Sequence, residues 1–281
     1  MNIGVIGLGL MGASFARTIK KKTNNKVYGT DRDSAVILKA SLIGAIDEEL
    51  THKNAQQLDM LIISIPPRGV SDILSEYIPL LKKGCTVLDF CGIKREICSL
   101  MSQKSKEYPN LFFFGGHPMA GREYSGIDHS VTTLFDNASM LIVPISSDIF
   151  NTEKVKAFFI DLGFKEVVFT NPELHDSEIA FTSQMCHVVS NAFIKSPAAI
   201  THHGYSAGSY KDLTRVARLD SSLWSALMMD NKDKLLFELK TIISHLDEYK
   251  NALENGDEER VKALLEDGNQ IKLRIDKRVK K

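Results

Sequence analysis

The stretch "GVIGLGLMG", residues 4–12, decides the fold of the first half of the chain. Gly7, Gly9 and Gly12 have the spacing G-x-G-x-x-G, directly after a predicted strand and at the start of a predicted helix. The first glycine permits a tight turn, the second lets the backbone approach a pyrophosphate, and the third lets helix and strand pack closely. Amide groups at the helix start then face the phosphates. The stretch therefore predicts a dinucleotide-binding unit.

A carboxylate at the end of the second predicted strand supports this interpretation. Asp31 ends "KVYGTD" (26–31), at the distance expected for a residue that accepts hydrogen bonds from the adenosine ribose. A carboxylate there disfavours a 2′-phosphate, so we predict NAD as the cofactor. Arg32 leaves NADP open, although a solvated surface charge is the preferred interpretation of this arginine. The other residues assigned to the cofactor site are Leu8, Leu10, Met11, Ser64 and Pro66.

Short apolar runs alternate with helix-like segments through the first half of the chain. The predicted strands cover residues 2–8, 26–31, 60–65, 86–90, 111–116, 139–144 and 165–170. Helices are predicted between them, for example over 12–22, 69–81 and 153–162. Such alternation predicts a parallel sheet covered on both faces. We expect an α/β protein with a Rossmann-like N-terminal domain.

The character of the sequence changes at "NPELHD" (171–176), and no convincing strand follows. We therefore predict a NAD-binding domain over 1–170 and a helical substrate and dimerisation domain over 171–281. The clearest helix carries an apolar stripe, formed by Leu235, Leu239, Ile242, Leu246, Tyr249 and Leu253. The stripe can pack inside one subunit or between two subunits. We expect a homodimer, because long helices in a C-terminal half often need a partner to bury them.

Composition narrows the classes of function. Lys and Arg number 35 and so do Asp and Glu, which argues against a nucleic-acid surface or a polybasic membrane patch. The four cysteines lack CxxC spacing, which predicts reduced thiols, a cytoplasmic location and no bound metal. The N-terminus lacks the basic region of a signal peptide, and no apolar run is long enough to cross a bilayer. A small-molecule substrate is the expected partner.

A histidine stands behind the apolar run "NLFFFG", in the stretch "GGHPMAGREYSG" (115–126). We expect a loop that holds His117 in a fixed place after the strand ends. Two interpretations of this loop are open. His117 either hydrogen-bonds to a backbone carbonyl or serves as a catalytic group, and the stretch alone favours the first.

The second half contains polar residues that a substrate site would use. The segment around "HDSEIAFTSQMCHVVSNAF" (175–193) is predicted to be a helix from about Glu173 onward, with an apolar stripe and a polar row. The stripe includes Ile179, Cys186, Val189 and Phe193, and the row contains Asp176, Ala180, Ser183, His187 and Asn191. A solvent-facing row is the ordinary interpretation, but the row has no Lys or Glu, which favours the wall of a cleft. Further on, Arg215, Arg218 and Trp224 stand close in sequence. An arginine there either binds a substrate carboxylate or pairs with a neighbour such as Asp212.

With these residues in place, the chain resembles the prephenate dehydrogenases and arogenate dehydrogenases of tyrosine biosynthesis, essentially from end to end. The matching motifs are G-x-G-L-M-G with Asp31, "HPMAGRE" (117–123), "HD" (175–176), Ser183-x-x-x-His187, "KDLTRVA" (211–217) and "LW" (223–224). The resemblance implies a Rossmann-like domain, a helical dimerisation domain and NAD as cofactor. It also implies oxidative decarboxylation of prephenate to 4-hydroxyphenylpyruvate.

The resemblance also implies roles for individual residues. His117 matches the catalytic group that takes the proton of the substrate hydroxyl, and Arg215 matches the arginine that holds the ring carboxylate. Ser183 and His187 match residues lining the substrate pocket. Glu123 and Trp224 match its edge, and Gly208 matches the place where a neighbouring subunit approaches it.

The chain departs from the family pattern in three places. "DFCGIK" has Cys91 and Gly92 where relatives have a glycine and a serine that helps to position the catalytic histidine and the substrate hydroxyl. "SQMCH" has Gln184 in place of a histidine, and "RLDSSLW" lacks a proline before Trp224. At Gly92, a water or Cys91 is left to replace the serine.

Several functions remain open on the sequence alone. Arogenate is the nearest alternative substrate, and the lack of an obvious acidic partner for its ammonium favours prephenate. A β-hydroxyacid dehydrogenase is another enzyme with this glycine turn, but "HPMAGRE" and "DLTRVA" argue against it. A non-catalytic NAD-binding relative is the alternative from a different class, and Gly92 is the feature that supports it.

Overall fold

The computed structural model describes residues 1–122, 124–202 and 204–279. The chain forms two compact units, Met1–Asn231 and the segment from Lys232 onward. The first unit extends past the predicted domain boundary at residue 170. The division of the chain into 1–170 and 171–281 stays a prediction.

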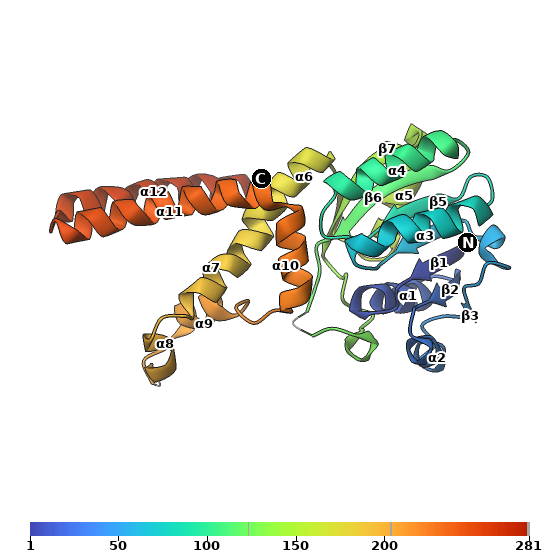
Figure 1. The fold of residues 1–281 in the computed structure, drawn as a ribbon, viewed down its shortest axis with the longest axis horizontal. Helices are drawn as coiled ribbons and strands as arrows, with labels where there is room; N and C mark the ends of the chain where they lie inside the picture. The colour runs from blue at the N-terminus through green and yellow to red at the C-terminus, as the bar shows by residue number, and fades with distance from the viewer. Residues whose placement is uncertain (123, 203, 280–281) are drawn as a thin grey trace. The chain divides into compact units, whose positions relative to one another are not determined.

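The first unit is built on an eight-stranded sheet with the order β3-β2-β1-β4-β5-β6-β7-β8 (Figure 1). The strands are β1 (Asn2–Ile6), β2 (Lys26–Thr30), β3 (Glu48–Glu49), β4 (Met60–Ile63), β5 (Thr86–Asp89), β6 (Phe112–Pro118), β7 (Ser139–Ser146) and β8 (Glu166–Phe169). Strand order reverses between β1 and β4, because the chain builds β2 and β3 on one side of β1 and the later strands on the other. Ligands of such sheets bind at this reversal, outside the carboxyl ends of the strands.

One strand contradicts the prediction of a parallel sheet. β7 pairs with β6 in the antiparallel direction, whereas the other neighbouring strands are parallel. Among its described residues, the connection from β6 to β7 contains the 3₁₀ turn η4 (Ile127–His129) and no crossover helix, so the chain returns beside β6 in the opposite direction. The same pairing extends β6 to Pro118 and places His117 opposite Leu141. The prediction that His117 lies in a loop is therefore wrong, and its backbone is fixed by the sheet.

Helices cover both faces of this sheet, as predicted. They are α1 (Leu10–Lys22), α2 (Ser34–Leu42), α3 (Val70–Tyr77), α4 (Arg95–Glu107) and α5 (Ile149–Asp161), with short 3₁₀ turns η1 (Ala55–Gln57), η2 (Pro67–Gly69) and η3 (Ile78–Leu80). Phe113 and Phe114 show the two-residue period of the strands, because they belong to separate buried apolar clusters. Each cluster packs helices against the sheet, and together they hold the carboxyl ends of the strands in place.

The part of the first unit from Pro172 to Asn231 consists of helices and their connections, and it has no strand among its described residues. The helices are α6 (Pro172–Ile179), the π-helical segment η5 (Ala180–Met185), α7 (Cys186–Phe193), α8 (Ala198–Thr201), α9 (Gly208–Thr214) and α10 (Ser221–Asp230). α6 begins close to the predicted start of this helix. The Asn171 side chain caps it by accepting a hydrogen bond from the Leu174 amide at 2.9 Å, and Pro172 takes the first helical position.

The predicted helix over 175–193 is not regular. The wide turn of η5 interrupts it, and the stripe predicted from regular spacing is only partly buried. Ile179 is buried, but Cys186 is exposed and Phe193 is 46% exposed. A π turn carries more residues than an α turn, so it changes which side of the helix the following residues occupy.

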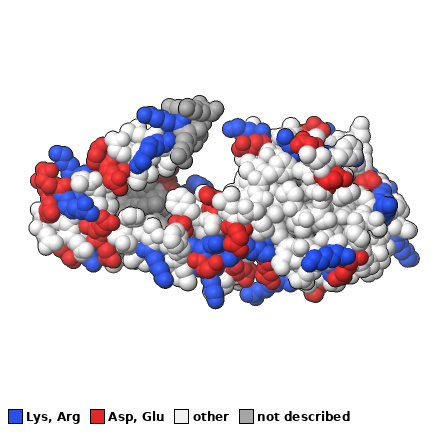
Figure 2. Space-filling model, turned by 90° about the horizontal axis from the view of Figure 1, so that it is seen from above, with Lys and Arg blue, Asp and Glu red and all other residues white. Residues whose placement is uncertain are grey.

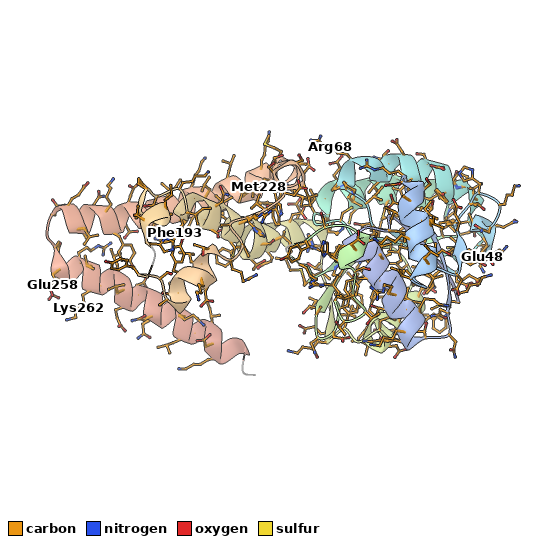
Figure 3. All side chains as sticks on the ribbon, turned by 90° about the horizontal axis from the view of Figure 1, so that it is seen from below. Glu48, Arg68, Phe193, Met228, Glu258 and Lys262 are labelled. Carbon is orange, nitrogen blue, oxygen red and sulfur yellow. The ribbon has the colours of Figure 1, made fainter. Side chains whose placement is uncertain are left out.

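The second unit is a hairpin of two long helices, α11 (Lys232–Glu254) and α12 (Glu258–Val279). Gly256 between them has φ +63°, a left-handed conformation that glycine adopts without strain. Glu258 and Lys262, one turn apart on α12, are both exposed (Figure 3). The predicted apolar stripe is not buried by this hairpin alone, because Leu246 and Leu253 are 60% and 68% exposed.

The surface carries charges of both signs. On the face drawn in Figure 2, basic and acidic side chains are interspersed, in agreement with the equal numbers of each in the chain. In the described ranges, no helix has both the length and the apolar composition needed to cross a membrane.

Candidate active site

The glycine turn lies between β1 and α1 and leaves an open cradle. Gly7 has φ +88°, and a Cβ added to it would lie 2.4 Å from the Ser64 carbonyl oxygen. A Cβ on Gly12 would lie 1.9 Å from the Gly7 carbonyl oxygen. A Cβ on Gly9, in contrast, would have no neighbouring heavy atom within 4 Å. Gly7 and Gly12 therefore serve the turn itself, and Gly9 opens a space through which a pyrophosphate can approach the backbone.

Helix α1 presents its first amides to this space. It starts at Leu10 with Gly9 as N-cap, and the first amide to donate back into the turn is that of Ala13, 3.0 Å from the Gly9 carbonyl oxygen. The amides of Leu10, Met11 and Gly12 precede it, where a helix has no internal acceptors. These amides suit a phosphate, which the helix dipole also favours.

Asp31 lies immediately after β2 and is held rigidly. One carboxylate oxygen accepts a hydrogen bond from the Leu8 amide at 2.8 Å, and the other accepts one from the Asp33 amide at 3.1 Å. Leu8 is buried and its amide is engaged, so its contribution is to hold Asp31. Arg32 beside it is exposed.

Ser64 and Pro66 follow β4 on the other side of the glycine turn. The Ser64 amide donates to the Ile6 carbonyl at 2.7 Å, which fixes Ser64 against the end of β1. Pro66 is exposed and precedes η2. The structure thus gathers the predicted cofactor residues at the reversal of strand order, where dinucleotides bind in such sheets.

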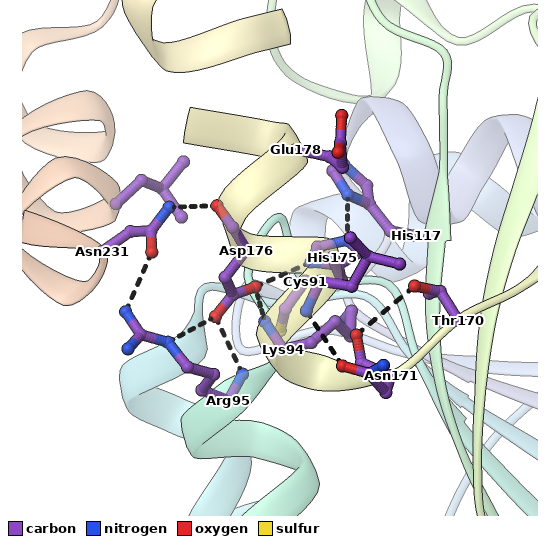
Figure 4. Close-up of polar contacts among 12 residues, drawn as sticks. Cys91, Lys94, Arg95, His117, Thr170, Asn171, His175, Asp176, Glu178 and Asn231 are labelled. Carbon is purple, nitrogen blue, oxygen red and sulfur yellow. Dashed lines mark hydrogen bonds and ion pairs between the residues drawn. The ribbon is translucent and has the colours of Figure 1, made fainter. Parts of the chain in front are cut away.

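His117 is the first member of a chain of hydrogen bonds at the end of β6 (Figure 4). Its Nδ1 lies 3.0 Å from Nε2 of His175 on α6. Nδ1 of His175 in turn lies 2.7 Å from Oδ1 of Asp176. The interpretation of His117 as a residue bonded to a backbone carbonyl does not describe this contact, because the partner is a second, buried imidazole.

Asp176 anchors this chain of hydrogen bonds. Its carboxylate accepts hydrogen bonds from the amide of Lys94 at 2.8 Å and from the amide of Arg95 at 3.0 Å. The Nε of Arg95 also lies 3.2 Å from it. The Asp176 backbone carbonyl accepts from Asn231, which also contacts Arg95 at 3.0 Å and Gln184 at 3.0 Å. The helical segment is thereby tied to the loop between β5 and α4.

A buried ion pair shapes that loop. The Lys94 ammonium donates to the Asp89 carboxylate, and both side chains are almost completely buried. Asp89 also accepts from the amide of Cys91 at 2.8 Å and from the amide of Gly116 at 3.3 Å. Gly116 precedes His117, so the ion pair fixes both the loop and the strand that carries His117.

The surroundings set the charge states of these groups. Burial lowers the pKa of His117 well below its usual value, and His175 and Lys94 lower it further. Burial also lowers the pKa of His175. Burial would raise the pKa of Asp176, but hydrogen bonds from His175 and the backbone outweigh this effect and lower it. His117 is therefore a neutral imidazole near pH 7, which can accept a proton, and Asp176 is ionised.

A second histidine lies against the single tryptophan. The rings of His187 on α7 and Trp224 on α10 have centroids 3.8 Å apart. Nδ1 of His187 lies 3.0 Å from the Val216 carbonyl oxygen, which can only accept a hydrogen bond. The hydrogen of a neutral His187 is therefore on Nδ1, and Nε2 is left as an acceptor. Asn191, one turn further, donates to the Ala217 carbonyl at 3.1 Å.

The other predicted substrate residues lie apart from the His117 hydrogen bonds. Arg215 is the C-cap of α9 and is exposed, and Gly208 begins the same helix. Ser183 lies within η5 and is half-buried. Glu123 lies outside the described residues.

The structure shows the surroundings of two of the three departures from the family pattern. A Cβ on Gly92 would lie 3.6 Å from a methyl group of Leu227 on α10, so a side chain fits there. The thiol of Cys91 lies 3.5 Å from the Ile65 carbonyl oxygen, and burial raises its pKa well above the usual value. Gln184 donates to the Leu227 carbonyl at 2.9 Å and so ties η5 to α10, the helix that carries Trp224.

Sequence reasoning missed several members of the site. His175 and Asp176 were visible as the "HD" pair, and Asp176 also stood in the predicted polar row, but neither was assigned a role. Asp89 and Lys94 stand at the two ends of the stretch "DFCGIK" but were assigned no role. Asn231 gave no signal in the sequence, because its partners are brought together only by the fold. Asn231, for example, contacts Arg95 across 136 positions.

Comparison with known proteins identifies the family. The family model of the prephenate dehydrogenase nucleotide-binding domain matches residues 15–168, and that of the prephenate dehydrogenase dimerization domain matches residues 171–267. The prephenate dehydrogenase of Lactococcus lactis subsp. cremoris is 29% identical over 279 residues, which cover 95% of this chain and 75% of that protein.

Two of the similar solved structures illustrate the likeness of the fold. Prephenate dehydrogenase from A. aeolicus, in complex with hydroxyphenyl propionate and NAD⁺, has a TM-score of 0.85 at 26% identity and covers 98% of both chains. Arogenate dehydrogenase from Synechocystis has a TM-score of 0.82 at 26% identity, covering 98% of this chain and 100% of that one. The predicted fold class is confirmed, and the chain belongs to the prephenate dehydrogenase family.

Proposed function

We propose that this protein catalyses the NAD-dependent oxidative decarboxylation of prephenate to 4-hydroxyphenylpyruvate, with His117 as the proton acceptor. One observation carries the proposal. A neutral imidazole is held in the sheet that also forms the glycine cradle, and its Nδ1 is occupied by a buried partner. An alcohol oxidation needs such a base, because the hydroxyl must lose its proton as the carbon loses hydride.

The cofactor site fits NAD. The amides of Leu10, Met11 and Gly12 would hold the pyrophosphate, and Asp31 would accept hydrogen bonds from the adenosine ribose. When bound, NAD supplies the acceptor for the hydride. The A. aeolicus relative was solved with NAD⁺, which supports this choice.

The substrate site is assigned to the helical segment. Arg215 would bind the ring carboxylate through its planar guanidinium, and its exposed position leaves it accessible to a ligand. His187, with Nε2 as an acceptor, and Trp224 would form one wall. Ser183 and Gly92 would line the same pocket, and Glu123 and Gly208 would lie at its edge. His117 takes the hydroxyl proton, and carbon dioxide leaves as the ring becomes aromatic.

We infer further that the protein is a homodimer in the cytoplasm. The match to a dimerization domain supports the dimer, and so do the exposed apolar side chains of the α11–α12 hairpin, Leu246 and Leu253 among them. The cytoplasmic location is supported by the free thiols of Cys85, Cys91, Cys98 and Cys186.

The test is NADH absorbance with purified protein and NAD, using prephenate and arogenate in parallel. We expect turnover of prephenate. Turnover of arogenate alone would keep the mechanism and change the substrate to the amino form. If neither acid is turned over while NAD still binds, the proposal is contradicted, and a non-catalytic NAD-binding protein is left.

A further inference from the structure

We propose that His175 and Asp176 are positioning residues, which hold His117 in the tautomer that has its free lone pair on Nε2. The chemical purpose of this arrangement rests on the proposed function. The arrangement itself is a property of the free protein and is testable without substrate.

The positions of the hydrogens along this chain can be assigned by starting at Asp176. Asp176 accepts hydrogen bonds from the backbone amides of Lys94 and Arg95, which can only donate, so its carboxylate is an acceptor. Its contact with Nδ1 of His175, at 2.7 Å, therefore needs a hydrogen on that nitrogen. A neutral His175 then carries its lone pair on Nε2.

The same reasoning carries the assignment to His117. The lone pair on Nε2 of His175 lies 3.0 Å from Nδ1 of His117, and only a hydrogen on this Nδ1 makes the contact a hydrogen bond. A neutral His117 consequently carries its own lone pair on Nε2. Because His175 is buried and occupies the Nδ1 side, Nε2 is the nitrogen left for a substrate hydroxyl.

The arrangement also stabilises the product of proton transfer. The proton leaves the substrate hydroxyl and binds to Nε2 of His117, which becomes an imidazolium with hydrogens on both nitrogens. Its Nδ1–H then donates to His175, which is backed by the Asp176 carboxylate. The positive charge of Lys94, which would repel the imidazolium, is balanced by the Asp89 carboxylate, and the guanidinium of Arg95 is hydrogen-bonded to Asp176. The added charge therefore faces a hydrogen-bond chain that ends in an anion.

Other groups near His117 do not supply this function. Gly92 has no side chain to donate or accept a hydrogen bond. The thiol of Cys91 contacts the Ile65 carbonyl oxygen. Within the described residues, the imidazole of His175 is thus the side chain that fixes the ring of His117. We infer that it does what the serine expected at position 92 would do.

Two substitutions of His175 separate positioning from packing. In His175→Gln, the side-chain carbonyl oxygen takes the place of Nε2 and can still accept from His117. In His175→Asn, the shorter amide can contact Asp176 but cannot reach His117. We expect His175→Asn to lower kcat by about 10- to 100-fold, with KM for NAD unchanged, and His175→Gln to recover most of this loss. Equal turnover in His175→Asn and the wild type would overturn the proposal.

The tautomer itself is read by NMR on histidine labelled with ¹⁵N, in the absence of substrate. His117→Asn identifies the signals of His117 by their loss. We expect Nδ1–H for His117 in the wild type and in His175→Gln, and a mixture of tautomers in His175→Asn. An Nε2–H tautomer in the wild type would overturn the proposal, whatever the activity. This measurement on the wild type also decides the case in which His175→Asn does not fold.

The two readouts keep this inference separate from the proposed function. If the wild type shows Nδ1–H at His117 but turns over neither prephenate nor arogenate, the proposed function fails and the positioning stands. If it turns over prephenate with the other tautomer, the function stands and the positioning fails.

Discussion

The glycine turn and His117 both lie at the carboxyl ends of strands of one sheet, but the turn is built from backbone and the His117 network from side chains. The turn is backbone, completed within residues 7–12, and it works because side chains are absent from it. The network is made of side chains that span from Asp89 to Asn231, and it works because each polar atom meets a partner. Substitutions in the turn should therefore change cofactor affinity through steric contact, whereas substitutions in the network should change turnover or stability through unpaired charge and lost hydrogen bonds.

The strongest test of this contrast is His117→Asn. We expect kcat to fall by about 10²- to 10⁴-fold, because the variant lacks the proton acceptor, while NAD affinity stays unchanged. Steady-state kinetics and NAD titration by fluorescence measure the two quantities. A large loss of NAD affinity would show that the network and the cofactor site are not separate.

Lys94→Met tests the buried part of the network. Removing the ammonium leaves the Asp89 carboxylate buried without its partner, which should lower the free energy of unfolding by about 3 to 5 kcal/mol. Urea denaturation measures the change. The matched control is Lys20→Met, which removes a partly exposed ion pair with Asp47 and should have a much smaller effect. Similar effects of both substitutions would remove the distinction between the buried and the exposed pair.

Gly9→Ala tests the turn at the point where the protein itself leaves room. Its Cβ meets no protein atom within 4 Å, so we expect an unchanged melting temperature. The methyl group would occupy the approach of the pyrophosphate, and KM for NAD should rise about tenfold, which corresponds to about 1.4 kcal/mol. Gly12→Ala is the comparison, because its Cβ would collide with the Gly7 carbonyl and should lower stability as well. Unchanged NAD binding in Gly9→Ala would place the pyrophosphate elsewhere.

The smallest expected effect concerns the pH dependence of kcat/KM. His117 must be neutral to accept a proton, and burial with its neighbours lowers its pKa. The value of kcat/KM should therefore stay level through neutral pH and fall only as pH drops through this lowered pKa, below the usual histidine value of about 6.5. A fall that already begins above that value would contradict a depressed pKa.

The same contrast explains how much of the fold and of the candidate site could be predicted from the sequence. The glycine turn, the first two strands and Asp31 follow from residues close in sequence, since backbone conformation is a local property. The motif also identified His117, but not its partner, because His175 lies 58 positions away. The antiparallel β7 was missed because strands alternating with helices predict a parallel sheet, whereas the described part of the segment between β6 and β7 contains no crossover helix. Asn231 joins Gln184 and Asp176 only after the chain has folded.

The π-helical segment η5 affects where the protein can tolerate the deletion of a residue. A deletion of one residue between Ala180 and Met185 would allow the helix to close as a regular α-helix, without loss of its backbone hydrogen bonds. The later residues of the helix would keep their sides, because the wide turn already holds one residue more than an α-turn would. His187 would then still face Val216 and Trp224. A deletion of one residue within α6 would, in contrast, rotate every later residue of the helix by about 100° relative to the residues before it, since an α-helix has about 3.6 residues per turn. That deletion would turn His187 away from its partners and disassemble the far wall of the site, although the helix itself remained intact.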